Sequence, residues 1–205
     1  ILEILAVGLG LEANHFETNV FGLERMSLTK IIRYPPTPDN QAGVNAHHDT
    51  GFITVLCCET SPGLQVQNEA GEWFDVTPPT PYTFVINLGE MLQGMTQNYF
   101  VATPHRVVNT QSIERFALGY FHGPSLSTKL SPLHLDESYV AAVKASRRHS
   151  HAGFMASKQE TEQGVGDMQS THRPDVYGEQ LYNYFARSYP NIMAVHYPDD
   201  TTTTS

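Results

Sequence analysis

Residues 47–58 read His-His-Asp-Thr-Gly-Phe-Ile-Thr-Val-Leu-Cys-Cys, a polar motif that runs directly into an apolar stretch of strand length. Successive side chains of a strand point to opposite faces, so His47 and Asp49 are expected to share one face while His48 points to the other. Another histidine, His105, follows much later in the chain. Two histidines and one carboxylate occupy one face of an octahedron and leave other positions open, which favours Fe(II). Structural zinc would instead require four closed ligands.

The motif belongs to a set of features that follow one another in a fixed order. Ten histidines in 205 residues make an isolated His-x-Asp pair unsurprising, and such a pair is usually no metal site. Here Gly43 and Asn45 precede the pair, an apolar strand follows it, and Arg115 stands ten residues beyond His105. The ordered set predicts that the pair and His105 bind one metal ion.

Several segments around these residues carry a resemblance to a known family. They are Lys30-Ile31-Ile32-Arg33-Tyr34-Pro35-Pro36, residues 47–52, Pro62-Gly63-Leu64-Gln65-Val66, residues 105–109 and Arg115-Phe116-Ala117. Over roughly residues 20–125 the chain resembles the isopenicillin N synthase-like family of Fe(II)- and 2-oxoglutarate-dependent dioxygenases. The resemblance implies a mainly β fold, a double-stranded β-helix (jelly-roll) core with flanking α-helices. It also implies Fe(II) held by His47, Asp49 and His105, 2-oxoglutarate and O₂ as co-substrates, and oxidation of a small molecule with release of succinate and CO₂.

Arg115 is the predicted anchor of the distal carboxylate of 2-oxoglutarate. A guanidinium fork matches a carboxylate in two parallel hydrogen bonds, which favours arginine over lysine. The alternative is a surface arginine paired with Glu114. Family members usually place serine two residues later, where this chain has Ala117, and many plant members have asparagine where it has Ile32. The resemblance gives Tyr34, in the Tyr-Pro-Pro motif, as a further co-substrate contact.

Residues 114–124 and 177–190 look most like a microbial branch of the family that includes the ethylene-forming enzyme. That enzyme uses an arginine where this chain has Lys30 and a phenylalanine where it has Tyr34, so its activity is not carried over. Lys30 is predicted to contact the substrate or the co-substrate. A strand lysine with its tip at the surface is the alternative.

Two other functions stay open on the residues alone. An oxidase can use the same iron site without 2-oxoglutarate, and a jelly roll can bind metal without turnover. Succinate release coupled to O₂ uptake separates the first alternative from a 2-oxoglutarate-dependent enzyme. The intact ligand set argues against the second.

The composition is that of a globular enzyme domain, with 40% hydrophobic and 16% charged residues. A net charge of −9 argues against a nucleic-acid partner, since phosphates are bound by clustered Lys and Arg. No apolar run reaches the roughly 18 residues of a membrane span. Cys57 and Cys58 are adjacent on an expected strand and poorly placed to bridge each other. We expect a soluble, cytoplasmic protein, a monomer or weak homo-oligomer, acting on a small molecule.

The hydrophobic pattern predicts one domain over residues 1–205, with a jelly-roll core at 28–125 and a C-terminal helical segment at 126–200. The N-terminal part of the family fold is expected to be missing, because residue 1 opens inside an amphipathic helical pattern. Strands are expected at 29–34, 52–58, 64–67, 73–76, 83–87, 106–109 and 116–121, the last two paired with each other. Helices are expected at 89–96, 137–144, 152–163 and 177–189, the last packed on the outside of the barrel.

Apolar residues inside these strands form the expected core, namely Phe52, Leu64, Phe84 and Leu88. Asn87, Met91 and Phe121 are candidates for lining the mouth of the barrel. The histidines without ligand spacing are expected to be structural or exposed; they are His122, His134, His149, His151, His172 and His196.

Overall fold

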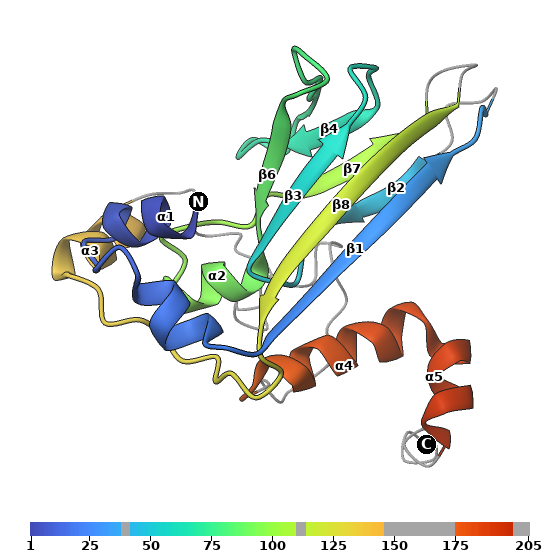
Figure 1. The fold of residues 1–205 in the computed structure, drawn as a ribbon. Coiled ribbons are helices and arrows are strands. Elements are labelled where there is room, and N and C mark those ends of the chain that lie inside the picture. Colours follow the sequence, from blue (N-terminus) through green and yellow to red (C-terminus); the bar gives the residue numbers. More distant parts are fainter. Residues whose placement is uncertain (38–41, 110–113, 146–174, 199–205) are drawn as a thin grey trace.

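The computed structural model describes residues 1–37, 42–109, 114–145 and 175–198 (Figure 1). The helix expected at 152–163 lies outside the described residues, and so do His149, His151 and His172.

The described residues form two four-stranded antiparallel sheets that face each other (Figure 1). The major sheet has the order β1-β8-β3-β6, with strands β1 (Arg25–Tyr34), β8 (Arg115–Pro124), β3 (Ile53–Cys58) and β6 (Phe84–Leu88). The minor sheet has the order β2-β7-β4-β5, with strands β2 (Ala42–His47), β7 (His105–Val108), β4 (Leu64–Gln67) and β5 (Trp73–Asp75). This two-sheet arrangement confirms the expected mainly β, jelly-roll fold.

The predicted strands agree with the observed ones within a few residues, and β1 begins four residues earlier than expected, at Arg25. The predicted pairing of β7 with β8 is wrong. β7 pairs with β2 and β4, whereas β8 pairs with β1 and β3 in the other sheet. Closeness in sequence suggested a hairpin, but the chain crosses between the two sheets at this point.

Six helices flank the sheets in the described residues: α1 (Leu2–Gly8), the π-helix η1 (Glu17–Phe21), α2 (Glu90–Met95), α3 (Glu137–Ala145), α4 (Tyr177–Ser188) and α5 (Pro190–His196). Pro190 begins α5, a position where its missing N–H leaves no helical hydrogen bond unmade. None of the described helices is long and apolar enough to cross a membrane.

Two clusters of buried residues form the core. The larger joins α1, η1 and α2 to the major sheet, and Phe52 lies at its centre with ring centroids 5.0 Å from Phe16 and 5.1 Å from Phe21. The smaller lies between the sheets and consists of Tyr34, Cys58, Leu64, Val107 and Ala117. Phe52 and Leu64 are thus core residues, as expected, and Leu88 packs against the larger cluster.

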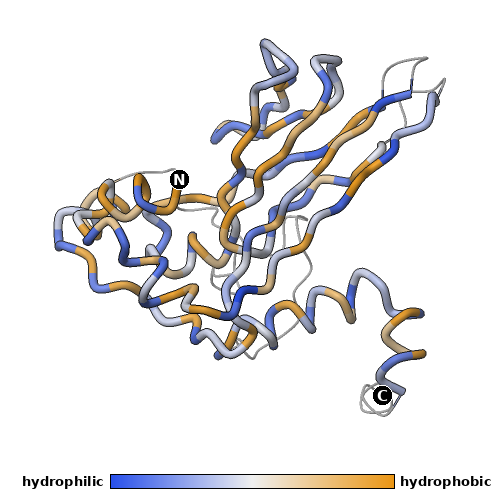
Figure 2. The backbone as a smooth tube through the Cα atoms, in the orientation of Figure 1, coloured by the Kyte–Doolittle hydropathy of each residue, from blue (hydrophilic) through white to orange (hydrophobic). Residues whose placement is uncertain are grey.

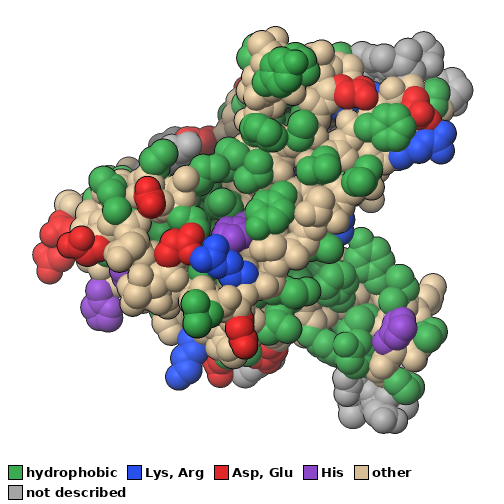
Figure 3. Space-filling model, viewed as in Figure 1, with side chains coloured by type: hydrophobic (Ala, Val, Ile, Leu, Met, Phe, Trp, Pro, Cys, Tyr) green, Lys and Arg blue, Asp and Glu red, His purple; other side chains and the backbone are tan. Residues whose placement is uncertain are grey.

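The expectation that Phe84 is a core residue is wrong, because its side chain is 57% exposed. Phe84 pairs with Cys57 on the face of the major sheet that points away from the minor sheet. Strand alternation places Leu118 on the same face, beside Cys57. Hydrophobic residues recur along β1, β3 and β8 (Figure 2), and many are visible on the surface (Figure 3).

Candidate metal centre

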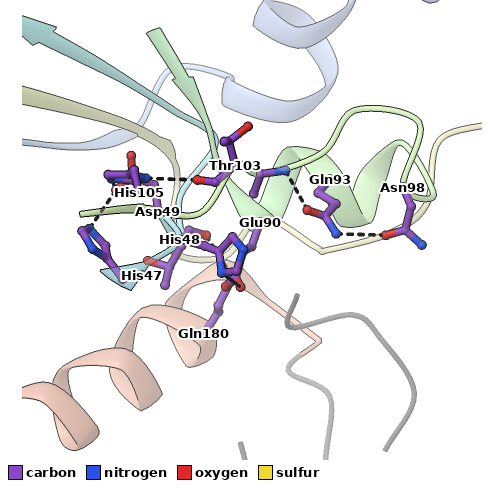
Figure 4. Close-up of polar contacts among 11 residues, drawn as sticks. His47, His48, Asp49, Glu90, Gln93, Asn98, Thr103, His105 and Gln180 are labelled. Atoms are coloured by element: carbon purple, nitrogen blue, oxygen red, sulfur yellow. Dashed lines mark hydrogen bonds and ion pairs between the residues drawn. The ribbon is translucent and has the colours of Figure 1, made fainter. Parts of the chain in front are cut away.

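The structure brings His47, Asp49 and His105 together. His47 is the last residue of β2 and lies opposite His105, the first residue of β7. Asp49 lies just beyond β2, in the loop that leads to β3, so the strand ends earlier than the motif suggested. The side chain of His48 points away from those of His47 and Asp49, as strand alternation predicts. It turns toward Glu90, and His48 Nδ1 lies 3.8 Å from Glu90 Oε1 (Figure 4).

The three side chains present one ligand atom each, and these atoms lie within 4.8 Å of one another. Asp49 Oδ1 is 3.9 Å from His47 Nε2 and 3.7 Å from His105 Nε2 (Figure 4). Asp49 is buried, and its Oδ2 has no hydrogen-bond partner among the described residues. A buried carboxylate oxygen without a partner is costly unless a ligand satisfies it, so the donor set fits a divalent cation.

Backbone carbonyls set the orientation of both imidazoles. His47 Nδ1 lies 2.8 Å from the carbonyl of Asn45, and His105 Nδ1 lies 3.1 Å from the carbonyl of Thr103. An N–H at Nδ1 donates to each carbonyl and leaves the Nε2 lone pair free to bind a metal. The sequence pattern identified the ligands but gave no sign of these carbonyl contacts.

Burial favours the neutral imidazole at His47 and at its neighbour His48. It lowers the pKa of His47, and the neighbouring His105 lowers that pKa further. Burial also lowers the pKa of His48 to about 4. Because metal binding requires the neutral imidazole, the burial of His47 favours the form that acts as a ligand.

Two helices hold the loop that carries Asp49. The backbone N–H of Glu90, the first residue of α2, donates to the carbonyl of Asp49 at 2.8 Å. From α4, the buried Gln180 donates through Nε2 to the carbonyl of Thr50 at 2.9 Å. α4 therefore borders the metal centre (Figure 4), which corrects the expectation that it packs on the outside of the barrel. Sequence reasoning missed Gln180, because nothing in its local pattern distinguishes it from an exposed glutamine.

Arg115 is buried between the sheets, with only 2% of its surface exposed. Its Nε donates to Ser61 Oγ at 3.0 Å, and its Cζ lies 5.5 Å from the ring centroid of Tyr34. Arg115 Nη1 is buried without a partner among the described residues. Glu114 pairs with Arg33 instead, at 2.6 Å, so the alternative of a surface pair between Arg115 and Glu114 is excluded. The guanidinium thus retains a donor for a ligand.

The turn between β3 and β4 shapes the Arg115 site. Gly63 has a φ of +136°, and a Cβ at this position would lie 2.4 Å from Arg115 Nη1. The sequence showed Ser61 and Gly63 only as parts of a turn, because their contact with Arg115 spans more than fifty residues.

Lys30 lies on the same face of the major sheet as Tyr34 and Arg115 but does not join them. It pairs with Gly119, whereas Tyr34 pairs with Arg115. Its Nζ is 5.3 Å from the ring centroid of Phe121. The structure thus groups Arg115 with Tyr34 and leaves Lys30 at a separate place.

The family model described as the 2OG-Fe(II) oxygenase superfamily matches residues 23–124. Gibberellin 2-beta-dioxygenase of Phaseolus coccineus is 35% identical over 140 residues, which are 65% of this chain and 42% of that protein. The 2-oxoglutarate-dependent dioxygenase citB of Monascus ruber is 36% identical over 111 residues, covering 51% of this chain and 33% of that protein. The chain therefore spans less than half the length of either relative.

Solved structures of two proteins share the fold. The crystal structure of JOX2 in complex with 2OG, Fe and JA has a TM-score of 0.61 at 27% identity, covering 65% of this chain and 40% of that one. A full-length protein of Neurospora crassa in complex with alpha-KG has a TM-score of 0.67 at 22% identity, covering 92% of this chain and 52% of that one. At that identity the second likeness concerns the fold alone.

Proposed function

The chain belongs, through residues 23–124, to the 2OG-Fe(II) oxygenase superfamily, and from that premise we propose that the protein is an Fe(II)- and 2-oxoglutarate-dependent dioxygenase acting on a small molecule. One observation carries the proposal: the same two-sheet fold holds three converging metal ligands and a buried arginine whose guanidinium keeps an unbonded donor. An enzyme of this class needs both a metal centre and a cation for the distal carboxylate of its co-substrate.

His47, Asp49 and His105 are the proposed iron ligands. Bound Fe(II), with 2-oxoglutarate and O₂, would supply oxidation of the substrate coupled to release of succinate and CO₂. The protein contributes two imidazoles, oriented by the carbonyls of Asn45 and Thr103, and a buried carboxylate. Three ligands on one side leave the remaining coordination positions for the reactants.

Arg115 is the proposed anchor of the distal carboxylate of 2-oxoglutarate. Ser61 accepts a hydrogen bond from Nε and fixes the plane of the guanidinium, while Nη1 stays available. Burial makes this interaction stronger than it would be in water. Tyr34 lies beside the guanidinium, and burial raises the pKa of its hydroxyl, so it remains a neutral donor.

An anaerobic titration of the Fe(II)-loaded protein with 2-oxoglutarate tests the proposal. The chelated complex is expected to give a weak visible charge-transfer band that saturates in the wild type. Arg115→Ala should raise the half-saturating concentration by about tenfold or more, because it removes a charge-assisted pair. Arg33→Ala, which removes an exposed arginine of the adjacent strand, is the matched control and should leave the titration unchanged.

Absence of the band despite bound iron would overturn the assignment of 2-oxoglutarate and favour an oxidase that uses iron alone. A band that is insensitive to Arg115→Ala would preserve the co-substrate but refute its anchor. Measured succinate release in step with O₂ uptake would complete the evidence.

Three finer assignments form part of the same proposal. The chain is assigned to the microbial branch that includes the ethylene-forming enzyme, supported by residues 114–124. Residues 1–205 are assigned to one catalytic domain, a monomer or weak homo-oligomer without a nucleic-acid partner. A cytoplasmic location is supported by Cys57 and Cys58, which are both free thiols.

A further inference from the structure

Lys30 occupies an aromatic site on the inner face of the major sheet. Its Nζ lies 5.3 Å from the ring centroid of Phe121, on β8, and 6.0 Å from that of Tyr189, which follows α4. Attraction between an ammonium and an aromatic face acts within about 6 Å, so both contacts are near the outer limit. No carboxylate oxygen lies within 4.0 Å of Lys30 among the described residues. The ammonium therefore keeps donors for a further partner.

This cation is distinct from the proposed co-substrate anchor. Lys30 and Tyr34 are four residues apart on β1, and Tyr34 is the residue that pairs with Arg115. At about 3.3 Å per residue, Lys30 stands roughly 13 Å along the strand from the Arg115 position. The carboxylate that Arg115 would hold therefore lies away from Lys30.

The surroundings of Lys30 also reach the metal centre. Tyr189 lies 6.4 Å from Tyr184, centroid to centroid. Burial raises the pKa of Tyr184, and Tyr189 and the carboxylate of Asp49 raise it further, which places Tyr184 within electrostatic range of a proposed metal ligand. Figure 3 shows a notch between the sheets and the C-terminal helices, with mainly apolar side chains on its visible walls. The aromatic rings beside Lys30 thus extend from Phe121 and Tyr189 to Tyr184, which the charge of Asp49 affects.

The charge of the whole chain makes a lysine without a carboxylate partner informative. At a net charge of −9 the protein repels anions on average, so an anion needs a local cation to bind. An ammonium offers three donors and a compact charge, which suits a carboxylate. The rings of Phe121 and Tyr189 offer flat apolar surfaces beside that charge.

We propose that Lys30, Phe121 and Tyr189 form the substrate-binding subsite, and that the substrate is a small carboxylic acid with an apolar body. Lys30 binds the carboxylate, while the two rings pack against the body and direct its far end toward the metal centre. The identification of this ligand as the substrate rests on the proposed function. The binding preference itself does not depend on turnover.

Calorimetry with matched probes tests the subsite. The protein, loaded with Zn(II) in place of Fe(II) and saturated with 2-oxoglutarate, is titrated with 3-phenylpropionate and, separately, with the neutral 3-phenylpropionamide. We expect the wild type to bind the acid roughly tenfold more tightly than the amide, as one charge-assisted hydrogen bond allows. Lys30→Met should abolish this preference, and Lys30→Arg should retain most of it. Lys144→Met, at an exposed lysine of α3, is the matched control and should retain all of it.

The outcomes separate this inference from the proposed function. Equal affinity for acid and amide in the wild type, binding of neither probe, or a preference that survives in Lys30→Met would each overturn the subsite. Persistence of the preference in Arg115→Ala is expected, because the acid is not a substitute for 2-oxoglutarate. Failure of 2-oxoglutarate to bind the Fe(II) protein would overturn the proposed function, and the acid preference, measured without 2-oxoglutarate, would still stand or fall with Lys30.

Discussion

At the scale of single residues, the position of Arg115 depends on the absence of a Cβ atom at Gly63. A methyl group at Gly63 would lie 2.4 Å from Arg115 Nη1 and 2.8 Å from the carbonyl of Val108. The guanidinium can give way more easily than the backbone, so it would leave the orientation that Ser61 sets. Gly63 is therefore a positioning residue for the proposed co-substrate anchor.

We predict that Gly63→Ala weakens 2-oxoglutarate binding by about tenfold, since it displaces one charge-assisted donor. Gly71→Ala is the matched control: Gly71 also has a positive φ, +82°, but a Cβ there meets only Gln67 Nε2, at 3.6 Å. Both variants should lose some thermal stability, because alanine is strained at positive φ. Only Gly63→Ala should shift the anaerobic titration, and an equal shift in both would refute the positioning role.

The proposed ligands and the proposed anchor were easier to predict than the residues that position them. His47, Asp49, His105 and Arg115 were found because their type and order suit one chemistry. Ser61 was missed, because its hydrogen bond to Arg115 joins residues 54 apart and no local pattern encodes it. The carbonyl contacts of the two imidazoles were missed for a simpler reason, since every residue has a carbonyl.

At the scale of elements, α4 supports the loop that carries Asp49. A side-chain hydrogen bond joins the helix to that loop, from Gln180 Nε2 to the carbonyl of Thr50. Groups that hold a ligand loop in place commonly change metal affinity by about 10–100-fold when removed. We therefore expect the helix to support iron binding without providing a ligand.

Gln180→Met is predicted to weaken Fe(II) binding by roughly tenfold while the strands stay folded. Gln97→Met is the control, because Gln97 also donates to a backbone carbonyl, that of Leu133, at 3.0 Å and away from the metal centre. Competition with a chelator of known affinity measures the difference. Equal iron affinity in the two variants would show that α4 does not support the site.

The sequence predicted which segments form strands or helices better than it predicted which strands pair with each other. Apolar runs and turns located the described strands other than β2 to within a few residues, because each signal is local. The pairing of β7 with β8 and the burial of Phe84 were predicted wrongly, since both depend on which sheet a strand joins and which face another element covers. Those properties belong to the assembled barrel.

At the scale of the whole molecule, His122 joins three elements and should make stability depend on pH. It lies on β8, with Nδ1 3.1 Å from Ser27 Oγ on β1, and its ring stacks on Phe21 of η1 at 4.4 Å. Burial, with a smaller effect of Arg25, lowers the pKa of His122 below 6.5. Below about pH 6.5 the unfolded chain then binds more protons than the native state, so the contribution of His122 to stability is complete above that value and is lost as the pH falls below it.

Urea unfolding of the metal-free protein at about pH 7.5 and about pH 5.5 checks this dependence, since the two values bracket the ordinary histidine pKa. His122→Gln should lose part of the decrease in unfolding free energy between the two pH values. His134→Gln, at an exposed histidine, should show the full wild-type decrease. An unchanged pH dependence in His122→Gln would contradict the prediction.

His47 on β2 lies opposite His105 on β7, and this pairing has a consequence for the free energy of unfolding. The register between these strands is irregular on both sides of Val44, so their ladder is weak beside the ligands. A divalent ion held by both histidines and Asp49 would act as a thermodynamic cross-link between segments that are distant in sequence. At a free ion concentration about one hundred times the dissociation constant, it would add about 2.7 kcal/mol to the free energy of unfolding. Adding EDTA should then lower the melting temperature of the wild type and leave that of His105→Ala unchanged, which makes fold stability itself a sensor of metal supply.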